Sequence, residues 1–178
     1  KMSNVALFTN RELVNTEFMQ TAINSLKKSK INPTLFDEVV VEPTDASFQF
    51  AANFSKNGNF DGYISLGGGS VIDTCKVGNL LATYPDNLLS YVNAPIGGAR
   101  AVPGPIMPHI ACPTTCGTGS EATGVAVFDL VTYYLKDEHK ERRTLGGASI
   151  QNQSSTTQRD NVAFPDHIKR VLDLYKNF

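Results

Sequence analysis

The stretch YISLGGGSVIDTCK, Tyr63–Lys76, joins an apolar run to a helix-forming segment through three consecutive glycines. The apolar run predicts a buried strand, and Ser70–Thr83 predicts a helix that ends before Pro85. Glycine lacks the Cβ that would hold a ligand away from the backbone, and the unpaired amides at a helix start favour an anion. A diphosphate therefore fits the corner formed by Gly67, Gly68, Gly69 and Ser70.

The same stretch also has a purely structural explanation. Ser70 and Asp73 have the S-x-x-D spacing of a capping pair, so a tight turn that only starts the helix explains these residues about as well. The run is not the G-x-G-x-x-G fingerprint, because Ile72 stands at the third glycine position. It is not a Walker loop either, since no Gly-Lys-Ser/Thr follows it.

The residues before this stretch alternate between strand and helix patterns. Strands are predicted over Asn4–Thr9, Pro33–Val41 and Asp61–Gly67, and amphipathic helices over Glu12–Lys28 and from Thr44 or Asp45 to Gly58. Such alternation predicts an α/β fold with a Rossmann-like parallel sheet and flanking helices. Ligands of such a sheet bind outside the carboxyl ends of its strands, where the glycine run lies.

A second polar loop, CPTTCGTGSEATG (Cys112–Gly124), follows another short apolar strand. It should therefore lie at the same edge of the sheet as the glycine run. The hydroxyls of Thr114, Thr115 and Thr118 can bind a ribose or a nicotinamide carboxamide. A hydroxyl-rich turn without a ligand is the alternative, and two such loops at one edge make that alternative less favoured.

Composition limits the class of protein. The chain has 178 residues and a net charge of −1, which favours one globular domain and predicts no nucleic-acid partner. No apolar run is long enough to span a bilayer, and the start resembles neither a signal nor a transit peptide, so no membrane partner is predicted. Three cysteines are typical of a reducing compartment such as the cytoplasm rather than of a disulfide framework.

The chain divides into two parts by composition. Residues 1–130 form the predicted nucleotide-binding α/β domain, and residues 131–178 form a divergent polar tail. Within the tail, residues 136–143 are almost all charged, residues 146–161 predict a loop or disorder, and residues 167–178 predict a terminal helix.

A metal site is not predicted from the residues. His109, Cys112 and Cys116 lie within eight residues, but a zinc site usually needs a fourth ligand or a water. An exposed histidine and two reduced thiols are the favoured interpretation. His139 and His167 are predicted to be solvated.

Two motifs together resemble the paired signature of the iron-containing (group III) alcohol dehydrogenases: GGGSVID at 67–73 and PTTCGTGSE at 113–121. The stretches VEPTDASF, GGGSVIDTCK and YVNAPIG resemble one branch of that family, the mitochondrial hydroxyacid-oxoacid transhydrogenases. The resemblance covers roughly Asn4–Asp129. It implies the N-terminal domain of the dehydroquinate synthase-like fold, with NAD or NADP as cofactor.

The resemblance also implies a role for particular residues. Gly67–Ser70 would hold the diphosphate with Asp73 nearby, and the three threonines of the second loop would contact the nicotinamide half. Asn10 would face the adenosine ribose, where the family usually has aspartate. A neutral amide repels a 2′-phosphate less than a carboxylate does, so the choice between NAD and NADP is left open at this point.

The implied activity couples oxidation of a hydroxyacid such as 4-hydroxybutyrate to reduction of an oxoacid such as 2-oxoglutarate, through bound cofactor. The family's helical second domain supplies iron or zinc ligands with D-x-x-x-H spacing, and this chain contains no such spacing. No catalytic residue is therefore predicted here, and the isolated chain is expected to be inactive. The alternatives are a non-catalytic nucleotide-binding module and another group III alcohol dehydrogenase. Mitochondrial location and a homo-oligomer are expectations by resemblance.

Overall fold

The computed structural model describes residues 2–130 and 148–151. Four parallel strands form its main sheet in the order β2-β1-β3-β4. The strands are β1 (Asn4–Phe8), β2 (Asn32–Phe36), β3 (Gly62–Gly67) and β4 (His109–Pro113). The helices that connect them are α1 (Glu17–Lys28), α2 (Asp45–Gly58) and α3 (Gly69–Thr83). The predicted α/β fold with a parallel sheet and flanking helices is confirmed.

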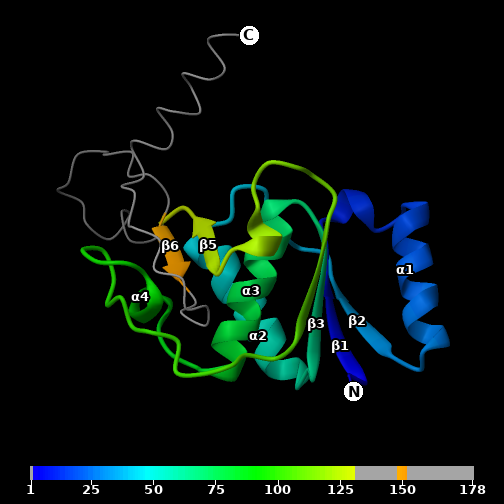
Figure 1. The fold of residues 1–178 in the computed structure, drawn as a ribbon, viewed down its shortest axis with the longest axis horizontal. Coiled ribbons are helices and arrows are strands. Elements are labelled where there is room, and N and C mark those ends of the chain that lie inside the picture. Colours follow the sequence, from blue (N-terminus) through cyan, green and yellow to red (C-terminus); the bar gives the residue numbers. More distant parts are fainter. Residues whose placement is uncertain (1, 131–147, 152–178) are drawn as a thin grey trace, which may run out of the picture.

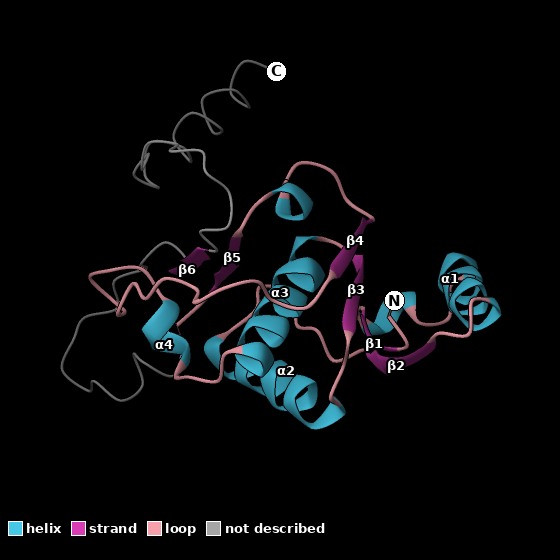
Figure 2. Ribbon diagram, turned by 60° about the horizontal axis from the view of Figure 1, so that its bottom comes forward, coloured by secondary structure: helices cyan, strands magenta, loops and turns pink. Residues whose placement is uncertain are grey.

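Helices cover both faces of the sheet, with α1 on one side and α2 and α3 on the other (Figures 1 and 2). Successive side chains of a strand point to opposite faces, and β1 uses both. Val5 and Leu7 pack with Met19 of α1, whereas Ala6 and Phe8 belong to the cluster that includes Ala51 of α2. Burial on both faces explains why β1 is apolar almost throughout.

A small second sheet lies apart from the main one. Strand β5 (Val125–Phe128) pairs antiparallel with β6 (Ala148–Gln151). The sequence predicts loop or disorder over 146–161, and for residues 148–151 that prediction is wrong. Pairing with β5 supplies backbone hydrogen-bond partners that composition alone does not reveal. The predicted charged run at 136–143 and terminal helix at 167–178 lie outside the described residues.

The first helix begins later than its apolar pattern predicts. Residues Arg11–Leu13 form a separate 3₁₀ turn, η1, and α1 begins only at Glu17. Thr16 is extended between them, and its hydroxyl donates to the carbonyl of Leu13 at 2.5 Å. A threonine hydroxyl that bonds the local backbone competes with helical hydrogen bonding, which accounts for the break.

The start of α2 agrees with the prediction from sequence. The Thr44 side chain accepts from the Ser47 amide while the Ser47 hydroxyl accepts from the Thr44 amide, which forms a capping box. At the other end Asn59 adopts the left-handed conformation, with φ of 48°. Asparagine tolerates that conformation better than most residues, so it takes the position often held by glycine.

The remaining short elements are α4 (Leu88–Tyr91) and η2 (Ser120–Ala122). Helix α4 lies between α3 and β4, in a segment rich in proline and glycine. No helix within the described ranges has both the length and the apolar character that a bilayer crossing requires.

Candidate functional site

The glycine run and the second polar loop lie side by side at the carboxyl edge of the sheet. Strands β3 and β4 are parallel neighbours, and their register places Gly67 opposite Pro113. The Thr114 amide donates to the Gly67 carbonyl at 2.9 Å, so the contact continues beyond the strand ends. The structure therefore brings together two loops whose centres are about fifty residues apart in sequence.

The three glycines meet different neighbours. A Cβ on Gly67 would lie 2.5 Å from Val71 Cγ2, so this glycine is required where the chain turns into α3. A Cβ on Gly68 would lie 3.2 Å from Thr115 Oγ1, and one on Gly69 would lie 3.0 Å from Thr118 Cγ2. Gly68 and Gly69 thus allow the threonine loop to approach the start of α3.

The first turn of α3 carries no negative charge of its own. Gly68 is the N-cap, no side chain caps the helix, and the first turn has no acidic residue. As the first residues of the helix, Gly69 and Ser70 have amides without intrahelical partners. A hollow of about 490 Å³ is lined by these two residues together with Thr118 and Ser120. Helix dipole and free amides both favour an anion in this position.

Asp73 does not form the predicted capping pair with Ser70. One of its oxygens accepts from the Val127 amide at 3.0 Å, and the other accepts from Lys76 Nζ at 3.2 Å. The residue is buried, with 5% of its surface exposed, although it also lines the hollow. The capping prediction is wrong because a distant strand offers the carboxylate a partner that the S-x-x-D spacing cannot reveal.

Asn10 lies at the carboxyl end of β1, next to the glycine run. The β1–β3 register pairs Phe8 with Ser65, and Thr9 Oγ1 donates to the Leu66 carbonyl at 2.9 Å. Continuing that register places Asn10 level with Gly67, on the side of β3 opposite to the threonine loop. The site residues predicted from sequence therefore gather at one edge of three adjacent strands.

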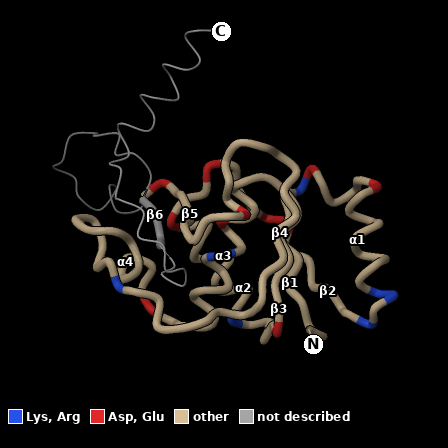
Figure 3. Tube along the Cα trace, viewed as in Figure 1, with Lys and Arg blue, Asp and Glu red and all other residues tan. Residues whose placement is uncertain are grey.

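Acidic residues are concentrated near this edge. Figure 3 shows Asp and Glu mainly around the carboxyl ends of the strands and Lys and Arg mostly on the opposite side of the molecule. The hollow itself is lined by Glu42, Asp73 and Asp129. An anionic ligand is thus attracted at this edge by the helix start rather than by a general positive potential.

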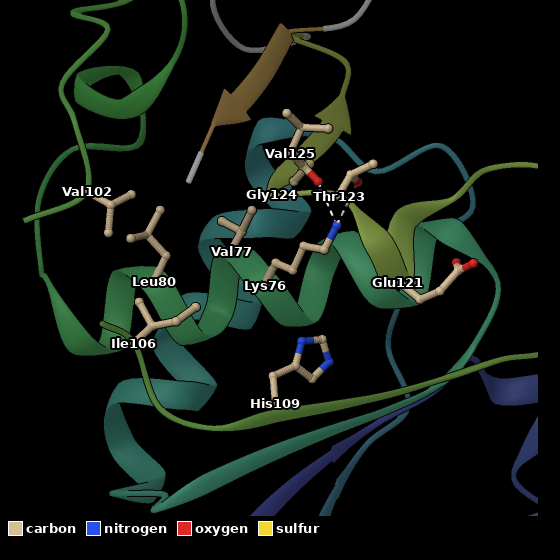
Figure 4. Close-up of a pocket in the computed structure, with 11 residues that line it drawn as sticks. Lys76, Val77, Leu80, Val102, Ile106, His109, Glu121, Thr123, Gly124 and Val125 are labelled. Atoms are coloured by element: carbon tan, nitrogen blue, oxygen red, sulfur yellow. Dashed lines mark hydrogen bonds between the residues drawn. The ribbon is translucent and has the colours of Figure 1, made fainter. Parts of the chain in front are cut away.

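A second cavity, of about 170 Å³, lies between α3, β4 and the loop before β5 (Figure 4). Its wall is apolar at one end, formed by Val77, Leu80, Val102 and Ile106. Lys76 and His109 face the other part, and the Lys76 side chain turns toward the loop that leads into β5. Its Nζ donates to the Val125 carbonyl at 2.7 Å.

His109 is not the exposed residue that the sequence predicts. One ring nitrogen lies 2.8 Å from Ser65 Oγ on the neighbouring strand. Burial, and to a smaller extent the positive charge of Lys76, lowers the pKa of His109 to about 4. Burial also lowers the pKa of Lys76, while Asp73 acts in the opposite direction. The only signal in the sequence was that His109 opens an apolar strand.

The described residues do not fit a metal site. His109 and Cys112 are three positions apart in β4, so their side chains point to opposite faces of the sheet. Within 2–130 and 148–151, no three histidine, cysteine or acidic side chains are grouped closely enough to hold a metal ion.

Comparison with known families gives these features a context. A family model described as iron-containing alcohol dehydrogenase matches residues 1–145. The chain belongs to the iron-containing alcohol dehydrogenase family.

Curated proteins from animals are similar in sequence to most of this chain. The hydroxyacid-oxoacid transhydrogenase of mitochondria from Xenopus laevis is 53% identical over 127 residues, and the protein of the same name from Homo sapiens is 51% identical over 127 residues. Each alignment covers 71% of this chain but 27% of the relative. The chain thus spans about a quarter of the length of the curated relatives it matches.

Solved structures of the family share the fold. The iron-containing alcohol dehydrogenase of Thermococcus thioreducens superposes with a TM-score of 0.71 at 20% identity, covering 85% of this chain and 37% of the other. The sulfoacetaldehyde reductase of Bifidobacterium kashiwanohense, solved in complex with NAD⁺, gives a TM-score of 0.68 at 23% identity, covering 85% and 36%. At these identities the likeness concerns the fold alone.

Proposed function

We propose that this chain binds a nicotinamide dinucleotide, NAD(H) or NADP(H), at the carboxyl edge of its main sheet. The diphosphate would accept hydrogen bonds from the amides of Gly68, Gly69 and Ser70. The nicotinamide half would lie against Thr114, Thr115 and Thr118. The observation that carries this proposal is the contact between the two loops, fixed by the hydrogen bond from the Thr114 amide to the Gly67 carbonyl.

Each group of residues at this site suits a different part of the dinucleotide. Backbone amides at a helix start can donate to several phosphate oxygens at once, and the helix dipole favours the negative charge. Threonine hydroxyls donate and accept, which suits ribose hydroxyls and a carboxamide. Asp73 is already bonded to Lys76 and Val127, so its role in binding would be to hold the edge of the hollow in place.

The activity that best fits this site is that of a hydroxyacid-oxoacid transhydrogenase. Hydride would pass from a small hydroxyacid, such as 4-hydroxybutyrate, to the bound cofactor and then to an oxoacid such as 2-oxoglutarate. The names and identities of the relatives support this choice, and their mitochondrial location supports the same compartment for this chain. A homo-oligomer remains part of the proposal.

This family uses iron or another metal such as zinc, which supplies an electrophile for the substrate oxygen when bound. The described residues provide no fitting ligand set, so no step is assigned to it in this chain. We expect the purified chain to bind cofactor without turnover. Turnover of hydroxyacid by the chain alone, with iron or zinc added, would contradict that expectation.

Two other functions are distinguishable from this one. A non-catalytic nucleotide-binding module would bind the cofactor but would not restore activity when mixed with the remainder of a related transhydrogenase. Another group III alcohol dehydrogenase would turn over simple alcohols in the same mixture. The identity of 53% to a transhydrogenase favours the proposed substrates over simple alcohols.

Cofactor binding is tested by titrating the chain into NADH and following nicotinamide fluorescence. The chain contains no tryptophan, so protein emission interferes little. The variant Gly69→Ala places a Cβ 3.0 Å from Thr118 and is expected to weaken binding by about tenfold or more. Ala82→Gly, an exchange in the last turn of the same helix, costs about 1 kcal/mol of helix stability and should leave binding unchanged. Equal binding by both variants would refute the site.

A further inference from the structure

The carboxyl end of β1 holds a cluster of charged residues that the proposed function does not use. We call this the β1 corner: Asn10, Arg11 and Glu12 after β1, with Asp37 and Glu38 after β2. The backbones of Asn10 and Glu38 form a bridge, and Arg11 Nε lies 4.0 Å from Asp37 Oδ2. The corner therefore consists of two neighbouring loops that are held together.

The Asn10 side chain is poorly placed to hydrogen-bond a ligand. Its Nδ2 donates to Glu12 Oε2 at 2.6 Å, so one of its two N–H groups is already used. Its Oδ1 is buried and has no hydrogen-bond partner among the described residues, so it is turned into the protein rather than toward solvent. Glu12, in contrast, is exposed. The accessible hydrogen-bond acceptor at the end of β1 is thus the Glu12 carboxylate.

The dinucleotide's orientation follows from the strand order. Strand β3, which carries the diphosphate site, has β4 on one side and β1 on the other. Neighbouring strands are about 4.8 Å apart, so a dinucleotide bound as proposed above would extend its two nucleoside halves over β4 and over β1. The hydroxyl-rich loop after β4 suits the nicotinamide half, which leaves the adenosine ribose at the β1 corner.

We propose that Glu12 determines the cofactor preference of this chain, by accepting hydrogen bonds from the adenosine ribose of NAD(H) and excluding NADP(H). This inference rests on the dinucleotide site proposed above. The 2′- and 3′-hydroxyls of NAD are two donors, which match a carboxylate acceptor. A 2′-phosphate is an anion with acceptor oxygens, so it repels the carboxylate and cannot replace those donors.

The net charge of the β1 corner also favours NAD(H) over NADP(H). Glu12, Asp37 and Glu38 are three carboxylates against the single guanidinium of Arg11, and Arg11 already faces Asp37. Placing an additional phosphate among these groups brings like charges together, which disfavours binding. The neutral Asn10 therefore does not make the corner neutral, because it presents its amide to a carboxylate two residues later.

The test compares NADH and NADPH binding, by nicotinamide fluorescence, for the unaltered chain and for Glu12→Gln. Glu17→Gln serves as the matched control, because it removes the same charge from an exposed residue at the start of α1. We expect the unaltered chain and the control to bind NADH at least about tenfold more tightly than NADPH. Glu12→Gln should reduce that ratio to about threefold or less.

The outcomes separate this inference from the proposed function. Equal binding of NADH and NADPH by the unaltered chain, or an unchanged ratio in Glu12→Gln, overturns the role of Glu12 while leaving the dinucleotide site intact. Tighter binding of NADPH that is lost in Arg11→Met also overturns it, since Arg11 would then read the 2′-phosphate. Binding of neither cofactor overturns the dinucleotide site and this inference together.

Discussion

Single residues in this chain acquire their properties from neighbours on other strands. Ser65 of β3 and His109 of β4 are 44 positions apart, yet their side chains are hydrogen-bonded. Strand pairing encloses the imidazole between the sheet and α3, and burial then keeps it uncharged. The place of His109 at the start of an apolar strand was the only signal in the sequence, and it did not reveal the Ser65 partner.

The pH dependence of stability tests the state of His109. Above pH 6.5 the imidazole is neutral in both the folded and the unfolded chain, so it has no effect. As the pH falls from 6.5 to about 4, the unfolded chain takes up a proton that the folded chain does not, and stability is lost. His109→Gln should remove up to about 3 kcal/mol of that loss. Urea denaturation across this range measures it, and parallel pH profiles for the two proteins would refute it.

At the scale of elements, the two helices α2 and α3 begin in opposite ways. Helix α2 satisfies its first amides with the Thr44–Ser47 capping box, whereas α3 has Gly68 as its N-cap and no side-chain cap. A helix start that uses its own side chains is stable without a ligand. The uncapped start of α3 gives up that contribution and leaves its amides available.

The capping box predicts a measurable difference between two threonines. Thr44→Ala should lower the free energy of unfolding by about 1 kcal/mol, because the Ser47 amide loses its acceptor. Thr16→Ala, at the start of α1, should cost less, because Thr16 makes no cap hydrogen bond to its helix. Chemical denaturation of both variants gives the comparison. A larger loss for Thr16→Ala would contradict this account of the two helix starts.

At the scale of the whole molecule, one ion pair connects the main sheet's helix layer to the second sheet. Asp73 and Lys76 of α3 are 3.2 Å apart, and they bond Val127 and Val125 of β5 respectively. Their side chains are 8% and 16% exposed, so solvent screens the pair little. The pair fixes β5 beside the start of α3, and residues of β5 line the hollow there.

Breaking this pair should destabilise the fold. Asp73→Ala leaves the Lys76 ammonium without its carboxylate and should cost about 3 kcal/mol. The double variant Asp73→Ala/Lys76→Met should cost less than the sum of the two single variants, because the second change removes the uncompensated charge. A double-mutant cycle by urea unfolding measures the coupling. Strictly additive losses would show that the pair does not act as a unit.

The local patterns of the sequence predicted most of the main sheet. The alternation of apolar strands and amphipathic helices was sufficient to predict the parallel α/β fold. The spacing of apolar residues within each element indicates which of its side chains are buried. A helix cap at Thr44 or Asp45 was also predicted, because a cap depends on nearby residues, and the structure uses Thr44. The errors at Asp73, His109 and the strand at 148–151 concern partners that are 54, 44 and about 23 positions away. The late start of α1 is an error with a local cause, the hydrogen bond from the Thr16 hydroxyl to the Leu13 carbonyl.

The sequence by itself predicted that two polar loops would lie at the carboxyl edge of one sheet, because glycine, hydroxyl and apolar residues have local conformational preferences. The tertiary structure decided that these loops touch, that Asp73 bonds β5, and that Glu12 rather than Asn10 presents the acceptor at the end of β1. The physical reason is that register and strand order bring together groups from distant parts of the chain. Hydrogen bonding then selects partners among the groups that meet.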